Sequence, residues 1–205
     1  MKVLLVNGSP KKDGNTADAL KTVAKALEAE GVQTEIVCLG GGAIADCIGC
    51  GRCAELGKCT FDDIVNELAE KAKEADGFVF GTPVYYAHPS ARLLAVMDRL
   101  SYSGGKYLKF KPAAAIAVAR RAGTVASMDV INKHFSINSM PIVSSTYWNQ
   151  AYGAAPGQAA QDTEGMMTMT NIGKNMAWML KCIEAGKEKG INAPENEKIA
   201  MNFIR

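Results

Sequence analysis

Short apolar runs alternate with longer amphipathic stretches along the chain. The short runs are almost continuously aliphatic, which is typical of strands that are buried on both faces of a sheet. They predict β-strands over residues 2–7, 32–39, 77–81, 113–119 and 141–144. Strands of this kind indicate a parallel sheet that is covered by helices on both sides.

The longer stretches carry apolar residues at helical spacing. In residues 17–30, Leu20, Val23 and Leu27 recur at intervals of three and four, and Gly31 supplies a stop. The same spacing predicts helices over residues 62–75, 90–100, 125–135 and 164–189. Strands and helices in strict alternation, joined by right-handed crossovers, give an α/β fold with a doubly wound, five-stranded parallel sheet.

No internal repeat, low-complexity tract or linker divides the 205 residues. We therefore expect one α/β domain over residues 1–190 and a polar C-terminal tail over residues 191–205. The cysteine-rich segment 47–59 is a loop inserted after the second strand of that domain.

Composition and charge narrow the class of protein. Hydrophobic residues make up 48% of the chain and charged residues 21%, which indicates a globular protein rather than a disordered one. A net charge of +2 without a basic stripe argues against nucleic-acid binding. No apolar run approaches the roughly 18–20 residues of a membrane span, and the first apolar run is too short for a signal peptide. We expect a cytoplasmic protein that binds neither nucleic acid nor membrane.

The loop after the first strand has the features of a phosphate site. Ligands of doubly wound sheets bind beyond the carboxyl ends of the strands. Residues 7–16 offer backbone amides, small hydroxyls and a helix N-terminus, and Lys11 or Lys12 adds positive charge. The spacing matches neither a Walker A loop nor the Gly-x-Gly-x-x-Gly fingerprint. A plain helix cap by Asn15 or Asp13 is the alternative interpretation.

The loops after the third and fourth strands add further candidates. Tyr85 and Tyr86 are adjacent aromatic residues at a strand exit, and such a loop can hold amides and aromatic faces against a flat ring. Either tyrosine can instead fill a subunit interface. Arg120 and Arg121 follow the fourth strand, where a cation can stabilise an anionic reduced cofactor unless both arginines are solvated.

Four of the six cysteines form a compact cluster, namely Cys47, Cys50, Cys53 and Cys59. Four thiolates at this spacing can ligate an iron-sulfur cubane, because a tight loop can wrap three of its corners. Zinc normally takes two cysteine pairs that are separated by a longer stretch, so the overlapping pairs favour iron and sulfur. Zinc, free thiols and a redox disulfide remain open as alternatives. The other two cysteines, Cys38 and Cys182, are expected to be small buried hydrophobic residues.

Three motifs together resemble a known family. Gly8-Ser9-Pro10 leading to Gly14-Asn15-Thr16, followed by Thr82-Pro83-Val84-Tyr85-Tyr86, resembles the NADPH-dependent FMN reductase branch of the flavodoxin-like superfamily. The cysteine segment resembles the iron-sulfur flavoproteins of anaerobic microbes within it. The resemblance runs over nearly the whole chain, including the stretch from Arg120 to Gly123. One departure is Thr124, where a further glycine is expected.

The resemblance implies a flavodoxin-like fold that binds FMN noncovalently in its domain over residues 1–190. The phosphate would contact Ser9, Asn15 and Thr16, with Lys11 as the added charge. The isoalloxazine ring would lie against Pro83, Val84, Tyr85 and Tyr86, and the loop that holds Arg121 and Gly123 would approach its pyrimidine edge. The resemblance also points to a [4Fe-4S] cluster on the four clustered cysteines and to a homodimer or homotetramer.

The resulting functional hypothesis is an FMN-dependent electron-transfer flavoprotein and oxidoreductase. Electrons would pass between FMN and the [4Fe-4S] cluster, from a donor such as ferredoxin or NAD(P)H, and no side chain need act as a catalytic nucleophile because the flavin carries the chemistry. An alternative is an NAD(P)H-dependent FMN or quinone reductase that lacks the cluster. A third hypothesis, from another class, is a non-catalytic binding module with a structural zinc site.

Overall fold

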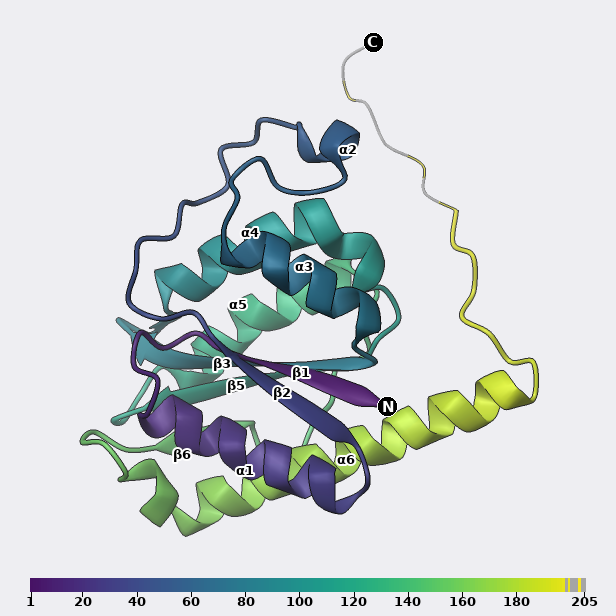
Figure 1. The fold of residues 1–205 in the computed structure, drawn as a ribbon. Coiled ribbons are helices and arrows are strands. Elements are labelled where there is room, and N and C mark those ends of the chain that lie inside the picture. Colours follow the sequence, from purple (N-terminus) through teal and green to yellow (C-terminus); the bar gives the residue numbers. More distant parts are fainter. Residues whose placement is uncertain (198, 200–202, 204–205) are drawn as a thin grey trace.

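The computed structural model describes residues 1–197, 199 and 203. Its sheet runs in the order β2, β1, β3, β5, β6, and each neighbouring pair is parallel (Figure 1). These strands are β1 (Lys2–Asn7), β2 (Gln33–Cys38), β3 (Gly77–Tyr85), β5 (Ala113–Ala119) and β6 (Gln150–Tyr152). The short strand β4 (His88–Pro89) pairs antiparallel with the end of β3. The predicted doubly wound sheet is confirmed, with six strands rather than five.

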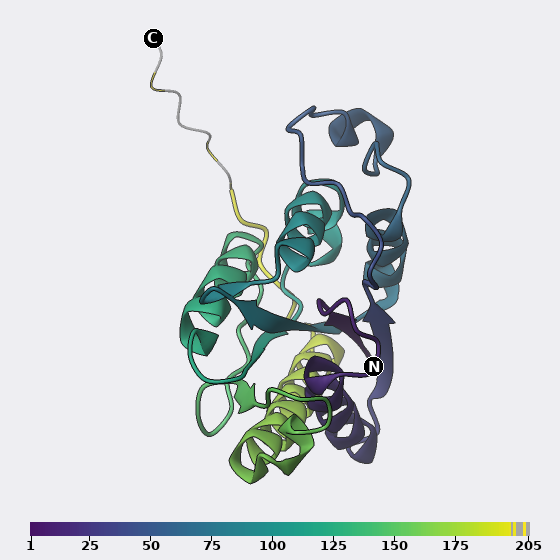
Figure 2. The same cartoon turned by 90° about the vertical axis from the view of Figure 1, so that its left-hand side faces the viewer.

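Helices cover both faces of this sheet (Figure 2). On one face lie α1 (Asn15–Ala29) and α6 (Thr163–Glu188), and on the other lie α3 (Ile64–Glu74), α4 (Ala91–Gly104) and α5 (Thr124–Ile137). The single-turn helix α2 (Cys53–Leu56) belongs to the cysteine segment and lies away from the sheet (Figure 1). Two 3-10 turns cover Gly105–Tyr107 and Ala159–Gln161.

Strand β1 shows why helices are needed on both faces. Leu4 and Val6 point into the apolar cluster formed with α3, α4 and α5, whereas Val3 and Leu5 point into the cluster formed with α1 and α6. Successive side chains of a strand point to opposite faces, so an all-apolar strand is stable only between two layers. The carboxyl ends of β1, β3 and β5 consequently meet at one edge of the sheet, and their exit loops lie side by side.

The last strand does not lie where the apolar run predicts it. Residues 141–144 form a single bridge, between Ala113 and Ile142, and Ile142 is 43% exposed. Ser145 then turns the chain, with its Oγ 2.7 Å from the carbonyl oxygen of Tyr147, and pairing with β5 resumes only at β6. The prediction of a strand over 141–144 is wrong because only Val143 of that run is buried.

Helix α6 ends at Glu188, close to the boundary that the sequence predicts at residue 190. The predicted tail includes residues 198, 200–202, 204 and 205, which lie outside the described residues. The division into domain and tail therefore stays a prediction. In the part of the chain that the structure describes, no helix is both long and apolar enough to cross a membrane.

The packing of α6 against α1 depends on a glycine. A Cβ atom at Gly173 would stand 2.6 Å from Ala26 Cβ and 2.8 Å from the carbonyl oxygen of Val23. Ile172 and Met176 flank this position and are fully buried. The missing side chain thus lets the two helix backbones approach closely while their larger neighbours fill the core.

We expect Gly173→Ala to lower the free energy of unfolding by about 1–3 kcal/mol, because the added methyl group overpacks this contact. Gly186→Ala in the same helix is the matched control, since an added Cβ there meets nothing closer than 3.8 Å. Its gain in helix propensity should stabilise the protein by up to about 1 kcal/mol. Urea unfolding of both variants makes the comparison, and equal effects would contradict the close approach.

An ion-pair network ties the edge strand β2 to its neighbours. The Glu35 carboxylate lies 2.7 Å from Lys2 Nζ of β1 and 2.5 Å from Lys71 Nζ of α3. The hydrogen bonds from Lys2 and Lys71 outweigh partial burial and hold the pKa of Glu35 below its ordinary value of 4.5. The carboxylate is therefore the form that the fold favours.

This lowered pKa predicts a pH-dependent contribution to stability. The contribution is complete above the pKa of Glu35 in the unfolded chain, and it is lost as the pH falls through the folded-state pKa. We expect Glu35→Gln to cost about 1 kcal/mol at neutral pH, and the stabilities of the two proteins to converge as the pH falls through the lowered folded-state pKa of Glu35. Urea unfolding as a function of pH measures this, and a gap that does not change with pH would contradict it.

Candidate functional site

A cavity of about 280 Å³ opens at the edge of the sheet where β1, β3 and β5 end. Seven of the ten predicted cofactor residues line it, namely Ser9, Lys11, Asn15, Thr16, Pro83, Val84 and Tyr85. The residues come from the loop after β1 with the first turn of α1, and from the last residues of β3, and the parallel sheet brings these distant parts of the chain together. The loop that follows β6 closes the cavity with Gly153, Ala154 and Pro156, which the sequence analysis did not single out.

The loop after β1 is fixed by its own polar side chains. Asn7 Oδ1 accepts a hydrogen bond from the Ser9 amide at 3.0 Å, and Asn7 Nδ2 donates to the carbonyl oxygen of Lys11 at 3.2 Å. The Gly8 amide donates to Gly81 of β3 at 2.8 Å. A Cβ atom at Gly8 would lie only 2.8 Å from that same carbonyl oxygen, so the close approach requires glycine.

This loop leaves the N-terminus of α1 open toward the cavity. No side chain in the described part of the chain caps this helix end, where Gly14 is the N-cap residue. Asp13 instead pairs with Lys21, 3.0 Å away. The alternative interpretation, a plain cap by Asn15 or Asp13, is therefore wrong. Uncapped amides at a helix N-terminus are suited to an anion such as a phosphate.

The Asn15 side chain has a structural role that the sequence did not reveal. Its Nδ2 donates to the carbonyl oxygen of Ala155 at 3.0 Å, and its Oδ1 accepts from the amide of Ala159 at 3.1 Å. Asn15 thus clamps the loop after β6 against the start of α1. Its partners are more than a hundred residues away in sequence, and no local pattern predicts such a contact.

We expect Asn15→Ala to loosen the loop over residues 153–159, because it removes two hydrogen bonds worth about 1 kcal/mol each. Hydrogen–deuterium exchange of the Ala159 amide should become faster. Asp13→Ala is the control in the same loop, because the ion pair of Asp13 with Lys21 is exposed and does not touch residues 153–159. Unchanged exchange in Asn15→Ala would contradict the clamp.

The loop after β3 is a tight hairpin that leads into β4. Tyr86 and Ala87 occupy its turn with φ angles of 51° and 58°, a left-handed conformation that non-glycine residues adopt only at a cost. Tyr85 is 48% exposed and lines the cavity, whereas Tyr86 is fully exposed and points to solvent. Tyr86 is therefore not part of the cavity wall.

The loop after β5 packs on this hairpin. Gly123 has a φ of 90°, and a Cβ atom there would lie 2.5 Å from Ala87 Cα. Thr124, which stands where a further glycine was expected, donates a hydrogen bond to Gln150 Oε1 of β6. Arg120 lines the cavity, whereas Arg121 does not. Gly123 and Arg121 thus lie next to the predicted ring site without forming its walls.

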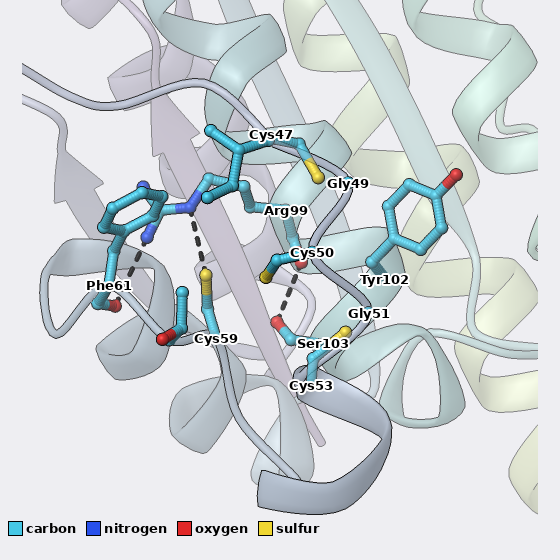
Figure 3. Close-up of a pocket in the computed structure, with 12 residues that line it drawn as sticks. Cys47, Gly49, Cys50, Gly51, Cys53, Cys59, Phe61, Arg99, Tyr102 and Ser103 are labelled. Carbon is cyan, nitrogen blue, oxygen red and sulfur yellow. Dashed lines mark hydrogen bonds between the residues drawn. The ribbon is translucent and has the colours of Figure 1, made fainter.

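The cysteine segment builds a second, separate cavity above α4, with a volume of about 130 Å³ (Figure 3). All four predicted ligands line it, namely Cys47, Cys50, Cys53 and Cys59. Gly49 and Gly51 adopt φ angles of 62° and 69°, which lets the backbone wrap around the cavity. Phe61, Arg99 and Tyr102 complete its walls, and the lining is mostly apolar.

The four thiols of the segment line one cavity, but they are not close enough to one another to form a metal-binding group. All six cysteines of the chain are free, and Cys50 is the most open of the four in the segment. Among residues 1–197, 199 and 203, no three histidine, cysteine or acidic side chains come close enough to hold a metal ion. In its donor chemistry the segment fits an iron-sulfur cluster, because four thiol groups surround one largely apolar hollow.

Arg99 of α4 lies beneath this segment and is almost completely buried, with 1% of its side chain exposed. Its Nε donates to Cys59 Sγ at 3.2 Å, and its two terminal nitrogens each donate to one carboxylate oxygen of Asp63 at 2.8 Å. They also donate to the carbonyl oxygens of Ala45 and Phe61, at 3.1 and 3.3 Å. Figure 3 shows the guanidinium between Cys59 and the Phe61 ring.

The electrostatics of this pair favour the charged forms. Burial alone would raise the pKa of Asp63, but hydrogen bonds from Arg99 and from the Val65 amide outweigh it and hold the pKa below its ordinary value. Burial likewise opposes the charge on Arg99, whereas Asp63 and Cys59 raise the pKa of Arg99 above its usual value. The guanidinium therefore remains a fixed positive charge beside the Cys59 sulfur.

Asn66 of α3 fixes the same stretch from the other side. Its Oδ1 accepts from the Cys59 amide at 2.9 Å, and its Nδ2 donates to the carbonyl oxygens of Cys59 and Phe61, both at 3.1 Å. The sequence analysis missed Asn66 and Arg99. A signal for Arg99 exists in its place on the apolar stripe of α4, between Val96 and Ser103, where a solvated arginine is not expected.

The two cysteines outside the segment differ from the prediction in part. Cys182 is exposed on α6, so the expectation of a buried residue is wrong there. It lies on the solvent side of a helix whose buried stripe passes through Met176, Ala177 and Leu180. Cys38 at the end of β2 is half-buried, 3.8 Å from Asn7 Nδ2.

The strand order and the cavity at the carboxyl ends of the parallel strands define a flavodoxin-like α/β protein. A solved flavodoxin from the domain Archaea has a similar fold, with a TM-score of 0.59 at 15% identity, over 88% of this chain and 99% of that chain. The model of the family "NADPH-dependent FMN reductase" matches residues 1–155. The chain belongs to this family and is a flavin-dependent oxidoreductase. The family match indicates FMN as its cofactor.

Two curated relatives place the chain more closely. An iron-sulfur flavoprotein of Methanocaldococcus jannaschii is 37% identical over 192 residues, which cover 90% of this chain and 100% of the relative. An iron-sulfur flavoprotein of Methanosarcina thermophila is 29% identical over 194 residues, which cover 92% of this chain and 100% of the relative. Within its family, the chain therefore belongs to the iron-sulfur flavoprotein group.

Proposed function

We propose that the protein relays electrons between FMN at the sheet edge and a [4Fe-4S] cluster held by Cys47, Cys50, Cys53 and Cys59. The observation that carries this proposal is that these four thiols, from both arms of one loop, line a single largely apolar cavity. The names of the relatives, which call them iron-sulfur flavoproteins, support the same assignment. When bound, the two groups supply the redox chemistry, and the chain supplies their binding and environment.

The sheet-edge cavity takes FMN in the orientation that the loops favour. The phosphate lies at the uncapped N-terminus of α1, where the Ser9 and Thr16 hydroxyls and the Lys11 ammonium add hydrogen bonds and charge. Asn15 contributes indirectly, since its amide is engaged with residues 155 and 159. The isoalloxazine ring lies against Pro83, Val84 and Tyr85.

The remaining predicted contacts lie around that ring rather than beneath it. Gly123 packs against Ala87 of the hairpin. The loop that holds Arg121 and Gly123 would approach the pyrimidine edge, with Arg120 as the cation that lines the cavity. Tyr86 stands fully exposed at the tip of the hairpin, which supports a role in a homodimer or homotetramer rather than in direct ring contact within one chain. In such an assembly the exposed tyrosine would cover a neighbouring subunit.

The electron donor is a ferredoxin or NAD(P)H. Tyr147 and Trp148 pack against each other just before β6 and are 52% and 56% exposed, which supports contact with a second protein surface. The clustering of four cysteines within thirteen residues, unlike the spread of cysteines in a secreted disulfide scaffold, supports work in a reducing compartment such as the cytoplasm.

Anaerobic purification followed by flavin, iron, sulfide and zinc analysis tests the proposal. We expect FMN together with about four iron and four sulfide per chain. Cys59→Ser should lose iron and sulfide while it keeps FMN, because the two cavities are separate. Cys182→Ser is the matched control, since this exposed thiol lies on α6 and should leave both cofactors unchanged.

Other results would overturn the proposal in distinct ways. Flavin without iron would leave an NAD(P)H-dependent FMN or quinone reductase, an alternative that the family match over residues 1–155 favours. Rapid steady-state oxidation of NADPH by iron-free protein with added FMN would support that alternative. Zinc without flavin would instead indicate a binding module.

A further inference from the structure

We propose that Arg99 is a positioning residue that sets the reduction potential of the cluster through its hydrogen bond to Cys59 Sγ. The inference rests on the proposed function, because it requires Cys59 to be a ligand. Beyond the proposed function, it assigns control of the cluster's reduction potential to one side chain of α4. Asp63 enters as the counter-charge that fixes the guanidinium and limits its effect.

Every N–H group of the Arg99 guanidinium has a hydrogen-bond acceptor in the structure. The guanidinium has five N–H groups, and these are matched by five acceptors: Cys59 Sγ, both carboxylate oxygens of Asp63, and the carbonyl oxygens of Ala45 and Phe61. The bidentate pair with Asp63 holds the planar group in one orientation. The Nε–H group is therefore held pointing at the Cys59 sulfur and cannot rotate toward solvent.

Burial makes this donor effective. In the part of the chain that the structure describes, Arg99 is the one charged side chain that is buried. Its positive charge is screened little by water, and the guanidinium carbon also lies 5.0 Å from the centre of the Phe61 ring. Asp63 bonds to the terminal nitrogens, on the edge away from Nε, so the sulfur faces the donor rather than the carboxylate.

A fixed donor on a ligand sulfur favours the reduced state of a cluster. Reduction by one electron, taken from a reduced ferredoxin or from the reduced flavin, adds one negative charge, and hydrogen bonds to the sulfurs together with net local charge set the potential. Removing the donor and its charge should therefore make the potential more negative. Removing the charge of Asp63 should make it more positive.

A purely structural role for Arg99 makes a different prediction. Through Ala45 and Phe61 the side chain joins both arms of the cysteine segment to α4. If it served only as this link, substitution would lower the melting temperature and the iron content without moving the potential of the clusters that remain. The potential is thus the readout that separates the two roles.

The test is a dye-mediated redox titration of the anaerobically purified protein, followed by the spectrum of the cluster. For Arg99→Gln we expect a shift of about 59 mV to more negative potential, which is tenfold in the ratio of reduced to oxidised cluster for one electron. Arg99→Lys keeps the charge but loses the Nε donor, and a smaller shift in the same direction should follow. Asp63→Asn should shift the potential the opposite way.

Arg92→Gln provides the matched control. Arg92 lies two turns earlier on the same helix and donates to the carbonyl oxygen of Gly42, in the same connection, at 2.6 Å. The substitution removes the same charge and a similar loop contact but no contact with sulfur. Its potential should equal that of the wild-type protein, and its melting temperature corrects for the lost loop contact.

The outcomes separate the inference from the proposed function. If the wild-type protein takes up no iron and sulfide, both are overturned. If it binds the cluster but Arg99→Lys, Arg99→Gln and Asp63→Asn keep the wild-type potential, only the inference is overturned. Should Arg99→Gln fail to fold, the signs of the potential shifts in Arg99→Lys and Asp63→Asn decide the test. A shift in Arg92→Gln as large as that in the Arg99 variants would also contradict the inference.

Discussion

The buried guanidinium of Arg99 is the interaction on which the shape of the cysteine segment depends. Between β2 and α3 the chain forms only the single-turn helix α2, so the segment lacks the backbone pairing that fixes a strand. Burying a charge is costly unless it is fully paired. Here Asp63 and three further acceptors offset the loss of hydration. The same hydrogen bonds attach both arms of the loop to α4.

The same helix also reaches the loops around the proposed flavin site. At its start, the Ser90 hydroxyl donates to the carbonyl oxygen of Gly8 in the loop after β1, and the Ser90 amide donates to Thr82 Oγ1 of β3. Arg99 follows nine residues later, about 14 Å along a helix that rises 1.5 Å per residue. Helix α4 is thus one rigid element whose first turn supports one cavity and whose third turn supports the other.

The sequence predicts the elements that depend on local pattern and on burial on both faces. Strands β1 and β5 have the predicted bounds, and all five long helices begin and end within a few residues of theirs. The strand over residues 141–144 fails because an apolar run does not reveal which of its residues find a partner. Strand β6 has only three residues and no pattern of its own, and its place is set by pairing with β5 and by the bond from the Tyr152 amide to Asp162.

The residues of the candidate site also fall into those that a local pattern predicts and those that only the fold brings together. Cys47, Cys50, Cys53 and Cys59 could be recognised because their spacing is local, and Ser9 and Thr16 because they occupy one loop. Contacts across the fold could not be predicted in this way, since the partners of Asn15 and Arg99 are set by tertiary packing. A charged residue within an apolar helix stripe was the one available signal, and it marks a position where burial must be compensated by specific partners.

In the proposed relay, electrons from a ferredoxin reach the flavin through a cluster in the cysteine cavity. Anaerobic stopped-flow reduction by a reduced ferredoxin tests it most directly, with flavin absorbance followed in the wild-type protein and in FMN-loaded Cys59→Ser. The account predicts rapid flavin reduction in the wild-type protein and much slower reduction in the variant that retains FMN but lacks the cluster. Equal rates in the two proteins would contradict it.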